Sequence, residues 1–162
     1  MRPEAYDMMR DLITRRIEPG SDVLDVGSRD VNGNYRNFIL ACGATYTGLD
    51  IVDGPNVDIV TEDPHRFPFE DEQFDAVISG ATMEHVTAIW LWVPELVRVL
   101  KPGGLLAILT HTSWPEHKFP VDCWRIMPDG MRYLFDLTGA LEDYHIISNQ
   151  FNIAARAYKT CS

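Results

Sequence analysis

One stretch of this sequence, residues 23–33, constrains the fold more than any other. It begins as a short apolar run that contains a single acid, Asp25, and then breaks into a polar turn bounded by Gly27 and Gly33. The segment after it, residues 34–42, can be helical. A strand that delivers its carboxyl end into a glycine turn and then a helix has the local geometry of nucleotide-type cofactor sites. An ordinary strand end has the same pattern, so residues further along the chain must decide between the two.

Apolar residues alternate between helical and strand spacing along the rest of the chain. Steps of three and four in residues 4–17 predict an amphipathic helix, which Pro19 and Gly20 stop. Further helices are predicted at 35–42, within 88–100 and at 129–137. Pro94 favours a late start for the middle one, because proline costs little in a first turn. Strands are predicted at 22–27, 46–50, 57–60, 74–79, 105–110, 144–148 and 152–158, the last two as an antiparallel hairpin. The alternation predicts an α/β domain with a mainly parallel sheet covered on both faces.

Composition narrows the class of protein and its partners. A chain of 162 residues with a net charge of −10 and scattered basic residues argues against bulk nucleic-acid binding and against an anionic membrane surface. Its apolar runs fall short of the roughly 20 residues of a membrane-spanning helix, and the first residues show no apolar signal region. Three widely spaced cysteines, Cys42, Cys123 and Cys161, indicate reduced thiols. We therefore expect a cytoplasmic location.

The residues at the predicted strand ends share one edge of the sheet, where cofactors bind in such folds. The first strand ends in Gly27 and Ser28, and the second ends in Asp50, an acid placed to accept both hydroxyls of a ribose. Asp63 follows the third strand, where it can accept from an exocyclic amine, and the fourth ends in Ser79 and Gly80. Each residue alone also fits a helix cap, a turn or a surface charge. Together they favour a cofactor site.

Ordered motifs in residues 23–109 resemble the class I S-adenosylmethionine-dependent methyltransferases, and within them the small "type 11" branch. The motifs are Val-Leu-Asp-Val-Gly at 23–27, Gly-Leu-Asp at 48–50, Phe-Pro-Phe at 67–69, Gln-Phe-Asp-Ala-Val at 73–77, Met-Glu-His-Val at 83–86 and Arg-Val-Leu-Lys-Pro-Gly-Gly at 98–104. The resemblance implies a Rossmann-like three-layer sandwich with a seven-stranded sheet whose last strand is antiparallel. We expect residues 1–162 to form one domain: a helix at 4–17, a cofactor half at 22–80 and an acceptor-side half at 81–162.

The resemblance also implies S-adenosyl-L-methionine as cofactor and S-adenosyl-L-homocysteine as product. Gly27 would lie beside the methionine part, Asp50 on the ribose and Asp63 beside the adenine. The full predicted set is Asp25, Gly27, Ser28, Arg29, Asp50, Ile51, Asp63, Pro64, Ser79 and Gly80. One departure from the family stands out, because its first motif has closely spaced glycines. Here Ser28, Arg29 and Asp30 follow Gly27, so the turn is bulkier, and Arg29 or Asp30 is placed to contact the amino-acid end of the cofactor.

Polar and aromatic residues after the fourth and fifth strands are candidates for the acceptor side. His85 and His111 are the predicted proton acceptors, while His117, Asp122, Trp124 and Arg125 are predicted to bind the acceptor. Simpler interpretations are a cap or structural hydrogen bond for Glu84 and His85, and mutual pairing of Asp122 and Arg125. Two histidines and an Asp can also bind a metal, but these lie on an irregular loop, and no metal site is predicted.

The predicted function is methyl transfer to a small-molecule acceptor by in-line displacement. Two other classes of protein are compatible with parts of the pattern. A nicotinamide oxidoreductase suits Asp50, but the turn at 27–33 does not spell GxGxxG and no Tyr-x-x-x-Lys pair is present. A non-catalytic cofactor-binding or structural partner subunit suits the short chain and the altered turn. Neither the acceptor nor the oligomeric state follows from the sequence.

Overall fold

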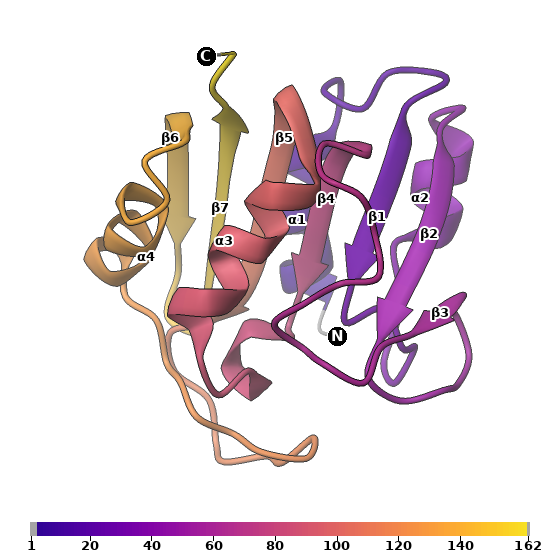
Figure 1. Ribbon diagram of the computed structural model, residues 1–162. Helices are drawn as coiled ribbons and strands as arrows, with labels where there is room; N and C mark the ends of the chain where they lie inside the picture. Colours follow the sequence, from indigo (N-terminus) through magenta and orange to yellow (C-terminus); the bar gives the residue numbers. More distant parts are fainter. Residues whose placement is uncertain (1–2, 162) are drawn as a thin grey trace.

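The computed structural model describes residues 3–161, which form one seven-stranded sheet with helices on both faces (Figure 1). The strands are β1 (Asp22–Val26), β2 (Thr45–Asp50), β3 (Ile59–Val60), β4 (Phe74–Gly80), β5 (Leu100–His111), β6 (Leu141–Ser148) and β7 (Asn152–Lys159). Their order across the sheet is β3-β2-β1-β4-β5-β7-β6. β7 runs against its neighbours, because it pairs antiparallel with both β5 and β6. This confirms the predicted Rossmann-like fold with an antiparallel last strand.

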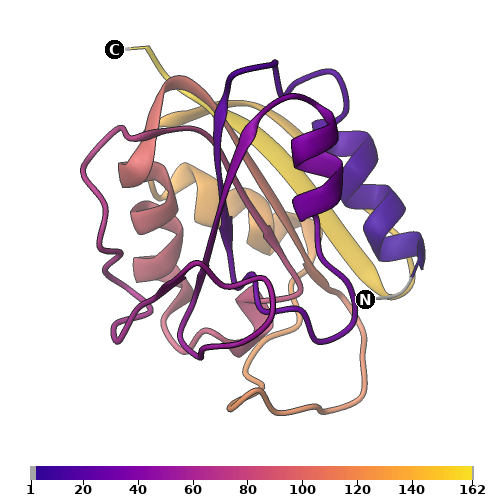
Figure 2. The ribbon, with the colours of Figure 1, turned by 90° about the vertical axis from the view of Figure 1, so that its right-hand side faces the viewer.

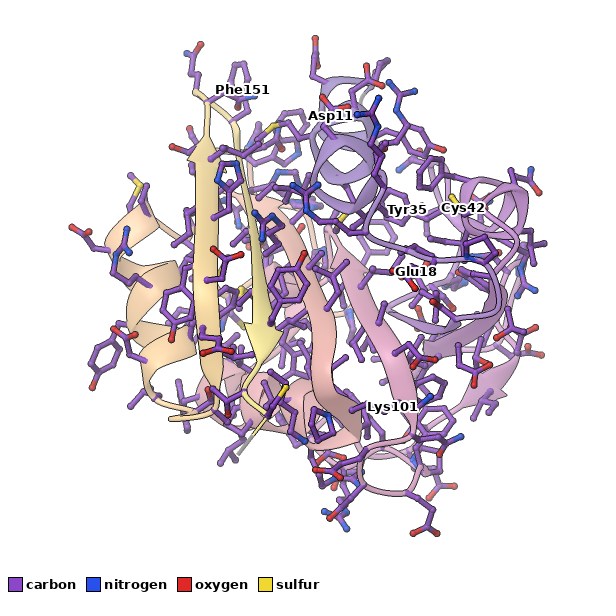
Figure 3. All side chains as sticks on the ribbon, turned by 90° about the horizontal axis from the view of Figure 1, so that it is seen from above. Asp11, Glu18, Tyr35, Cys42, Lys101 and Phe151 are labelled. Atoms are coloured by element: carbon purple, nitrogen blue, oxygen red, sulfur yellow. The ribbon has the colours of Figure 1, made fainter. Side chains whose placement is uncertain are left out.

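Two apolar layers hold helices against the sheet. α1 (Pro3–Ile13) and α2 (Arg36–Ala41) cover one face, and α3 (Ile89–Val99) and α4 (Pro128–Asp136) cover the other. In the view of Figure 3, Asp11 on α1 and Cys42 after α2 lie on the same side of the strands. Successive side chains of a strand point to opposite faces of the sheet, so each strand contributes to both apolar layers. On β1, Leu24 and Val26 face α3 while Val23 faces α1. The long apolar run of β5 is buried on both faces, as expected of a central strand.

Three boundaries differ from the prediction for local reasons. The first helix ends at Ile13 rather than at residue 17, because Arg15 adopts a positive φ of 63°. The strand β3 has only two residues. The backbone N–H of Gly48 on β2 donates to the Asp58 carboxylate at 2.7 Å, so a side chain takes the place of a further backbone hydrogen bond between the strands. Pro94 lies well inside α3 instead of in its first turn. The expected late start of that helix is therefore wrong.

The crossover connections bring several loops to the carboxyl ends of the parallel strands. Residues 112–127, which we call the acceptor-side loop, extend past the lower end of the sheet in Figure 1, and Figure 2 shows the same loop from the side. The short 3-10 helix η1 (Met83–His85) follows β4 at this end. No helix within residues 3–161 is long and apolar enough to cross a membrane. The carboxyl end of the sheet is thus where side chains of distant segments meet.

Candidate active site

A cavity of about 920 Å³ lies at the carboxyl ends of β1, β2, β4 and β5. Its volume falls within the range of small-molecule and cofactor sites. One end is lined by the turn after β1 and by the end of β2, including Asp25, Gly27 and Asp50. The other end is lined by residues after β4 and by the acceptor-side loop, including His85 and His111. Both halves of the predicted site therefore open into one space.

The turn after β1 requires glycine for a reason that the sequence did not reveal. Gly27 has a φ of +79°, and a Cβ atom there would overlap the side chain of Thr82 after β4. Its amide donates to the carbonyl of Leu49 at 2.8 Å. Asp30 stabilises the unusual part of the turn, because its carboxylate accepts from the amide of Gly33 at 2.7 Å. The bulkier turn is thus fixed by its own side chains.

Asp25 is buried behind this turn and hydrogen-bonded to a neighbouring strand. The Tyr46 hydroxyl donates to its Oδ2 at 2.6 Å, and the side-chain amide of Asn56 donates to that hydroxyl at 2.7 Å. Arg36 in turn donates to the Asn56 side-chain oxygen at 2.7 Å and stacks over the Tyr46 ring. Burial raises the pKa of Asp25 to about 7, although the Tyr46 hydrogen bond opposes the shift. Asp25 lines the cavity as part of an ordered polar chain.

Asp50 lies where a ribose-binding acid is predicted. Its Oδ2 accepts from the amide of Arg29 at 3.0 Å and its Oδ1 from the amide of Val52 at 3.1 Å. Each carboxylate oxygen keeps a further lone pair, so Asp50 can still accept from ligand hydroxyls in the cavity. Ile51 and Val52 line the cavity beside it and are about two-fifths exposed. Apolar side chains open to a cavity suit one face of a planar ring, and these residues therefore fit a nucleoside.

The remaining cofactor candidates divide between lining and supporting positions. Gly80 and Pro64 line the cavity. Asp63 is largely exposed, and its Oδ1 accepts from the amide of His65 at 2.8 Å. Ser79 is fully buried and its hydroxyl donates to the carbonyl of Val26 at 2.7 Å, which ties β4 to β1. Neither Asp63 nor Ser79 is among the described lining residues, and direct contact of either with the cofactor stays a prediction.

A buried carboxylate lies at the acceptor end of the cavity. Glu84 is fully buried on η1, and its Oε2 accepts from the Thr110 hydroxyl at 2.7 Å. Its Oε1 faces Nε2 of His111 at 3.2 Å and Nε2 of His85 at 3.9 Å. Within residues 3–161 this Oε1 accepts no hydrogen bond of acceptable geometry. Burial lowers the pKa of His111, against the opposing charge of Glu84, and its Nδ1 lies 3.0 Å from Oδ1 of Asn152.

The acceptor-side loop brings a third histidine to the same place. The ring of His117 lies 4.8 Å from that of His85, centroid to centroid. Asp122 holds the loop, because it accepts from the His117 amide at 2.8 Å and pairs with Arg125 at 2.7 and 2.8 Å. Hydrogen bonding to Arg125 holds the pKa of Asp122 well below its usual range. The mutual pairing of Asp122 and Arg125 is confirmed.

The four residues predicted to bind the acceptor fall into two groups, one that lines the cavity and one that does not. His117 lines the cavity, whereas Asp122, Trp124 and Arg125 are not among the lining residues that the structure describes. Trp124 donates its indole N–H to the carbonyl of Val86 at 2.7 Å. These three side chains support the cavity wall, and a direct role in acceptor binding stays a prediction for each of them.

Several residues of the site could not be found from the sequence. Trp114 stacks on His111 at 5.2 Å, and both Trp114 and Phe119 line the cavity. Thr82 fills the space beside Gly27. In the sequence Glu84 stands out only as the neighbour of His85. No regular spacing links it to His111 and His117, which lie 27 and 33 residues further along the chain. Its burial against β5 appears only in the fold.

Comparison with known proteins identifies the family. A family model described as a methyltransferase domain matches residues 24–108, more than half of the chain. A 2-methyl-6-phytyl-1,4-hydroquinone methyltransferase from Synechocystis sp. is 29% identical over 132 residues, which cover 74% of this chain and 41% of that protein. A demethylmenaquinone methyltransferase from Staphylococcus saprophyticus is 37% identical over 71 residues, or 44% of this chain and 30% of that protein. The chain spans less than half the length of these two relatives.

Solved structures share the fold. The 1,6-didemethyltoxoflavin-N1-methyltransferase of Burkholderia thailandensis, crystallised with S-adenosylhomocysteine, superposes with a TM-score of 0.74 at 15% identity over 98% of this chain and 77% of that one. The [4+2]-cyclase SpnF has a TM-score of 0.76 at 16% identity over 98% of this chain and 82% of its own. This chain belongs to the class I S-adenosylmethionine-dependent methyltransferases, and S-adenosylmethionine is the cofactor of its family.

Proposed function

We propose that the protein transfers the methyl group of S-adenosylmethionine to a small-molecule acceptor. One observation carries the proposal: a single cavity joins the ribose-type acid Asp50 to the histidines at its other end. Bound S-adenosylmethionine supplies a methyl group on a sulfonium, which is already activated for displacement. The acceptor end is lined by Trp114 and Phe119, and aromatic side chains favour a flat, partly apolar molecule.

The protein's contribution to such a transfer is mainly positioning. Reacting atoms must be held in line at roughly 3–3.5 Å, which alone removes several kcal/mol from a barrier. Asp50 would fix the donor at one end of the cavity, and Trp114 and Phe119 would fix the acceptor at the other. The names of the relatives above include a hydroquinone methyltransferase. Hydroxyaromatic molecules are therefore the first acceptors to test.

A hydroxyl acceptor must also lose its proton. His85 and His111 line the cavity and are the predicted proton acceptors, for which loss of a general base costs on the order of 10²–10⁴-fold in rate. The double variant His85→Ala, His111→Ala is expected to lose this factor with a hydroxyl acceptor and to keep most of its rate with a neutral amine. An equal loss with both acceptors would remove the proton-accepting role.

Calorimetry with S-adenosylhomocysteine tests the cofactor site directly. Wild-type protein is expected to bind, and Asp50→Ala is expected to weaken binding at least about tenfold, since each lost charge-assisted hydrogen bond is worth roughly 1.5–3 kcal/mol. Glu62→Ala, an exposed acid outside the lining residues, is the matched control and should bind like wild type. Asp63→Ala tests the predicted adenine contact in the same titration. Binding that is unchanged in Asp50→Ala would overturn the assignment.

The same titration separates the other classes of protein. Binding of NAD in place of S-adenosylhomocysteine would favour an oxidoreductase, and binding without turnover on any acceptor would favour a non-catalytic subunit. A cytoplasmic location is part of the proposal, because Cys42, Cys123 and Cys161 all carry free thiols. Partners other than a small-molecule acceptor are not proposed.

A further inference from the structure

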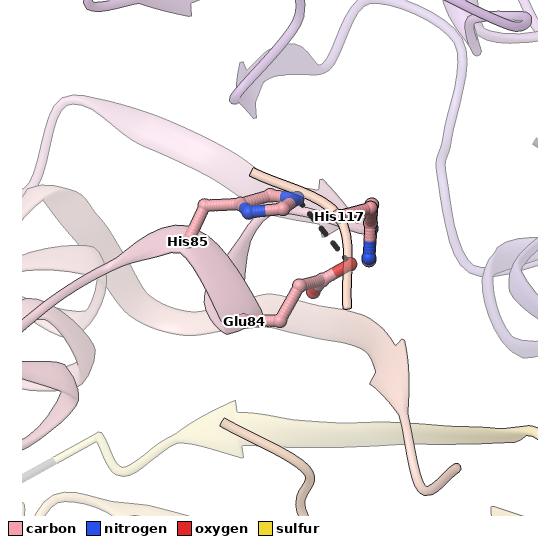
Figure 4. Close-up of side chains that lie close together, drawn as sticks. All are labelled: Glu84, His85 and His117. Atoms are coloured by element: carbon pink, nitrogen blue, oxygen red, sulfur yellow. Dashed lines mark ion pairs between the residues drawn. The ribbon is translucent and has the colours of Figure 1, made fainter. Parts of the chain in front are cut away.

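Three of the five histidines of the chain gather around one buried carboxylate. Glu84, His85 and His117 each offer a ligand atom, and these atoms all lie within 4.8 Å of one another (Figure 4). His111 adds a fourth, with its Nε2 at 3.2 Å from Glu84 Oε1. The groups come from three segments: η1, the end of β5 and the acceptor-side loop. Three partly buried imidazoles that line the cavity thus meet at one buried acid.

In the part of the chain that the structure describes, the surroundings of Glu84 Oε1 lack a hydrogen-bond donor that stabilises this buried oxygen. The atom is buried in a fully buried side chain, and it accepts no hydrogen bond of acceptable geometry within residues 3–161. A buried polar oxygen that accepts no hydrogen bond costs about 1–3 kcal/mol, and more when it is charged. The Thr110 hydroxyl satisfies only the other oxygen, Oε2. A cation beside Oε1 would remove this cost.

The rings are oriented so that a metal ion can lie between them and Glu84. Nδ1 of His85 lies 2.6 Å from the carbonyl of Val121, which can only accept, and the other ring nitrogen, Nε2, is directed toward Glu84. His111 is arranged in the same way, with Nδ1 at 3.0 Å from Asn152 Oδ1 and Nε2 toward Glu84. A cation between these Nε2 atoms and the carboxylate oxygen would bind to all of them at once.

The surrounding hydrogen bonds match those of metal-binding histidines. A ligand histidine usually donates its second ring N–H to a carbonyl or carboxylate, which fixes its orientation. His85 has the Val121 carbonyl in this role. Nδ1 of His117 lies 3.2 Å from the carbonyl of Pro115 and 3.4 Å from Asp122. The same support extends to Glu84 through Thr110.

We propose that Glu84, His85 and His117, with His111 beside them, bind a divalent transition-metal ion such as Zn²⁺ at the acceptor end of the cavity. Two imidazoles and a carboxylate with an open position are a ligand set of catalytic zinc. Tetrahedral ligands at about 2.0–2.1 Å from zinc are about 3.4 Å apart, so closure from the present spacing needs shifts of about 1 Å. The two histidines and the Asp that the sequence offers as metal ligands do not include Glu84, which is the anionic member of this set.

The position of the site gives the ion a chemical role. The three histidines line the cavity, whereas Glu84 lies behind them, so the open position faces the acceptor. A hydroxyl bound to the ion is acidified by it and releases its proton to solvent. The resulting oxyanion attacks the methyl carbon, the C–S bond breaks, and its electron pair stays on sulfur as neutral S-adenosylhomocysteine. With the ion bound, His85 and His111 serve as its ligands, and acidification by the ion replaces the proton-accepting role proposed for them above. This step rests on the proposed function, whereas metal binding does not.

The test measures metal and cofactor separately on the full chain. After removal of metals with a chelator, Co²⁺ is titrated and followed by its visible d–d absorption and by calorimetry. Wild type is expected to bind one ion per chain. Glu84→Gln and His117→Ala should weaken binding by at least about 100-fold, the upper end of the cost of losing even an outer-shell partner. His145→Ala, an exposed histidine on β6, is the matched control and should bind like wild type.

Each result decides between the proposals. Equal Co²⁺ affinity in all four proteins, or no binding by wild type, would overturn the metal site. Titration with S-adenosylhomocysteine on the same samples reports the cofactor end, so its failure with intact Co²⁺ binding would reject only the proposed function. If Glu84→Gln loses both its far-ultraviolet circular dichroism and cofactor binding, His117→Ala on the irregular loop decides alone.

Discussion

Replacing Asp25 by Asn should change how the stability of the protein depends on pH. The pKa of Asp25 is about 7 in the folded protein, against 3.8 for an ordinary Asp. Between these values the folded state binds a proton that the unfolded state has released, so the free energy of unfolding falls as pH rises through the window. Each pKa unit corresponds to about 1.4 kcal/mol, so the ceiling is about 4 kcal/mol.

Urea denaturation from pH 4 to pH 8 measures this contribution as a difference between two proteins. The side-chain amide introduced by Asp25→Asn does not ionise, so this variant should gain stability relative to wild type as pH rises, by about 2–4 kcal/mol in total. Titration of all other groups cancels in the difference. Asp75→Asn is the control. Burial raises the pKa of Asp75, but hydrogen bonds from the Asp22 amide and Lys101 outweigh it and lower the pKa.

Asp75 is therefore ionised in both states above pH 5, and Asp75→Asn should differ from wild type by a constant amount there. A difference between Asp25→Asn and wild type that varies by less than about 1 kcal/mol across the range would refute the argument, since each pKa unit is worth about 1.4 kcal/mol. It would show that Asp25 keeps access to solvent or to a cation in the folded protein.

Three further changes probe the turn, the buried ion pair and the loop. Gly27→Ala would force a Cβ atom into Thr82 at a φ of +79°, and we expect loss of S-adenosylhomocysteine binding by calorimetry, with Gly139→Ala, which has open space, as the comparison for φ strain. Arg98→Met leaves the Glu95 carboxylate buried without its bidentate partner and should lower the free energy of unfolding by about 3–5 kcal/mol in urea. Arg125→Met releases the acceptor-side loop and should speed its cleavage in limited proteolysis while leaving cofactor affinity unchanged.

The sheet could be predicted from the sequence because its signals are local. Buried parallel strands such as β4 appear as short apolar runs, and Gly43 marks the end of α2. The ends of α1 and β3 were less accurate, since they depend on a single residue in each case. The positive φ of Arg15 and the Asp58–Gly48 hydrogen bond leave no periodic pattern.

Which residues line the cavity near β1 and β2 was also easier to predict from the sequence than which residues line it near the acceptor-side loop. Asp50 is the last residue of β2, and the position of a strand end in a parallel sheet determines which side chains meet. The acceptor end depends on an irregular loop, where His117 is placed by Asp122 rather than by any repeat. Glu84 joins His111 only because η1 packs against β5. Contacts of this kind arise from tertiary packing and have no signal in spacing.

The contact between Gly27 and Thr82 has a consequence for how donor and acceptor are spaced. Thr82 immediately precedes η1, which carries Glu84 and His85, so the turn proposed to hold the donor touches the segment proposed to hold the acceptor. No room for even a methyl group exists between them. Methyl transfer depends on a gap of roughly 3–3.5 Å between reacting atoms. For the proposed transfer, the close packing of the Thr82 side chain on the backbone of Gly27 would help to fix that gap.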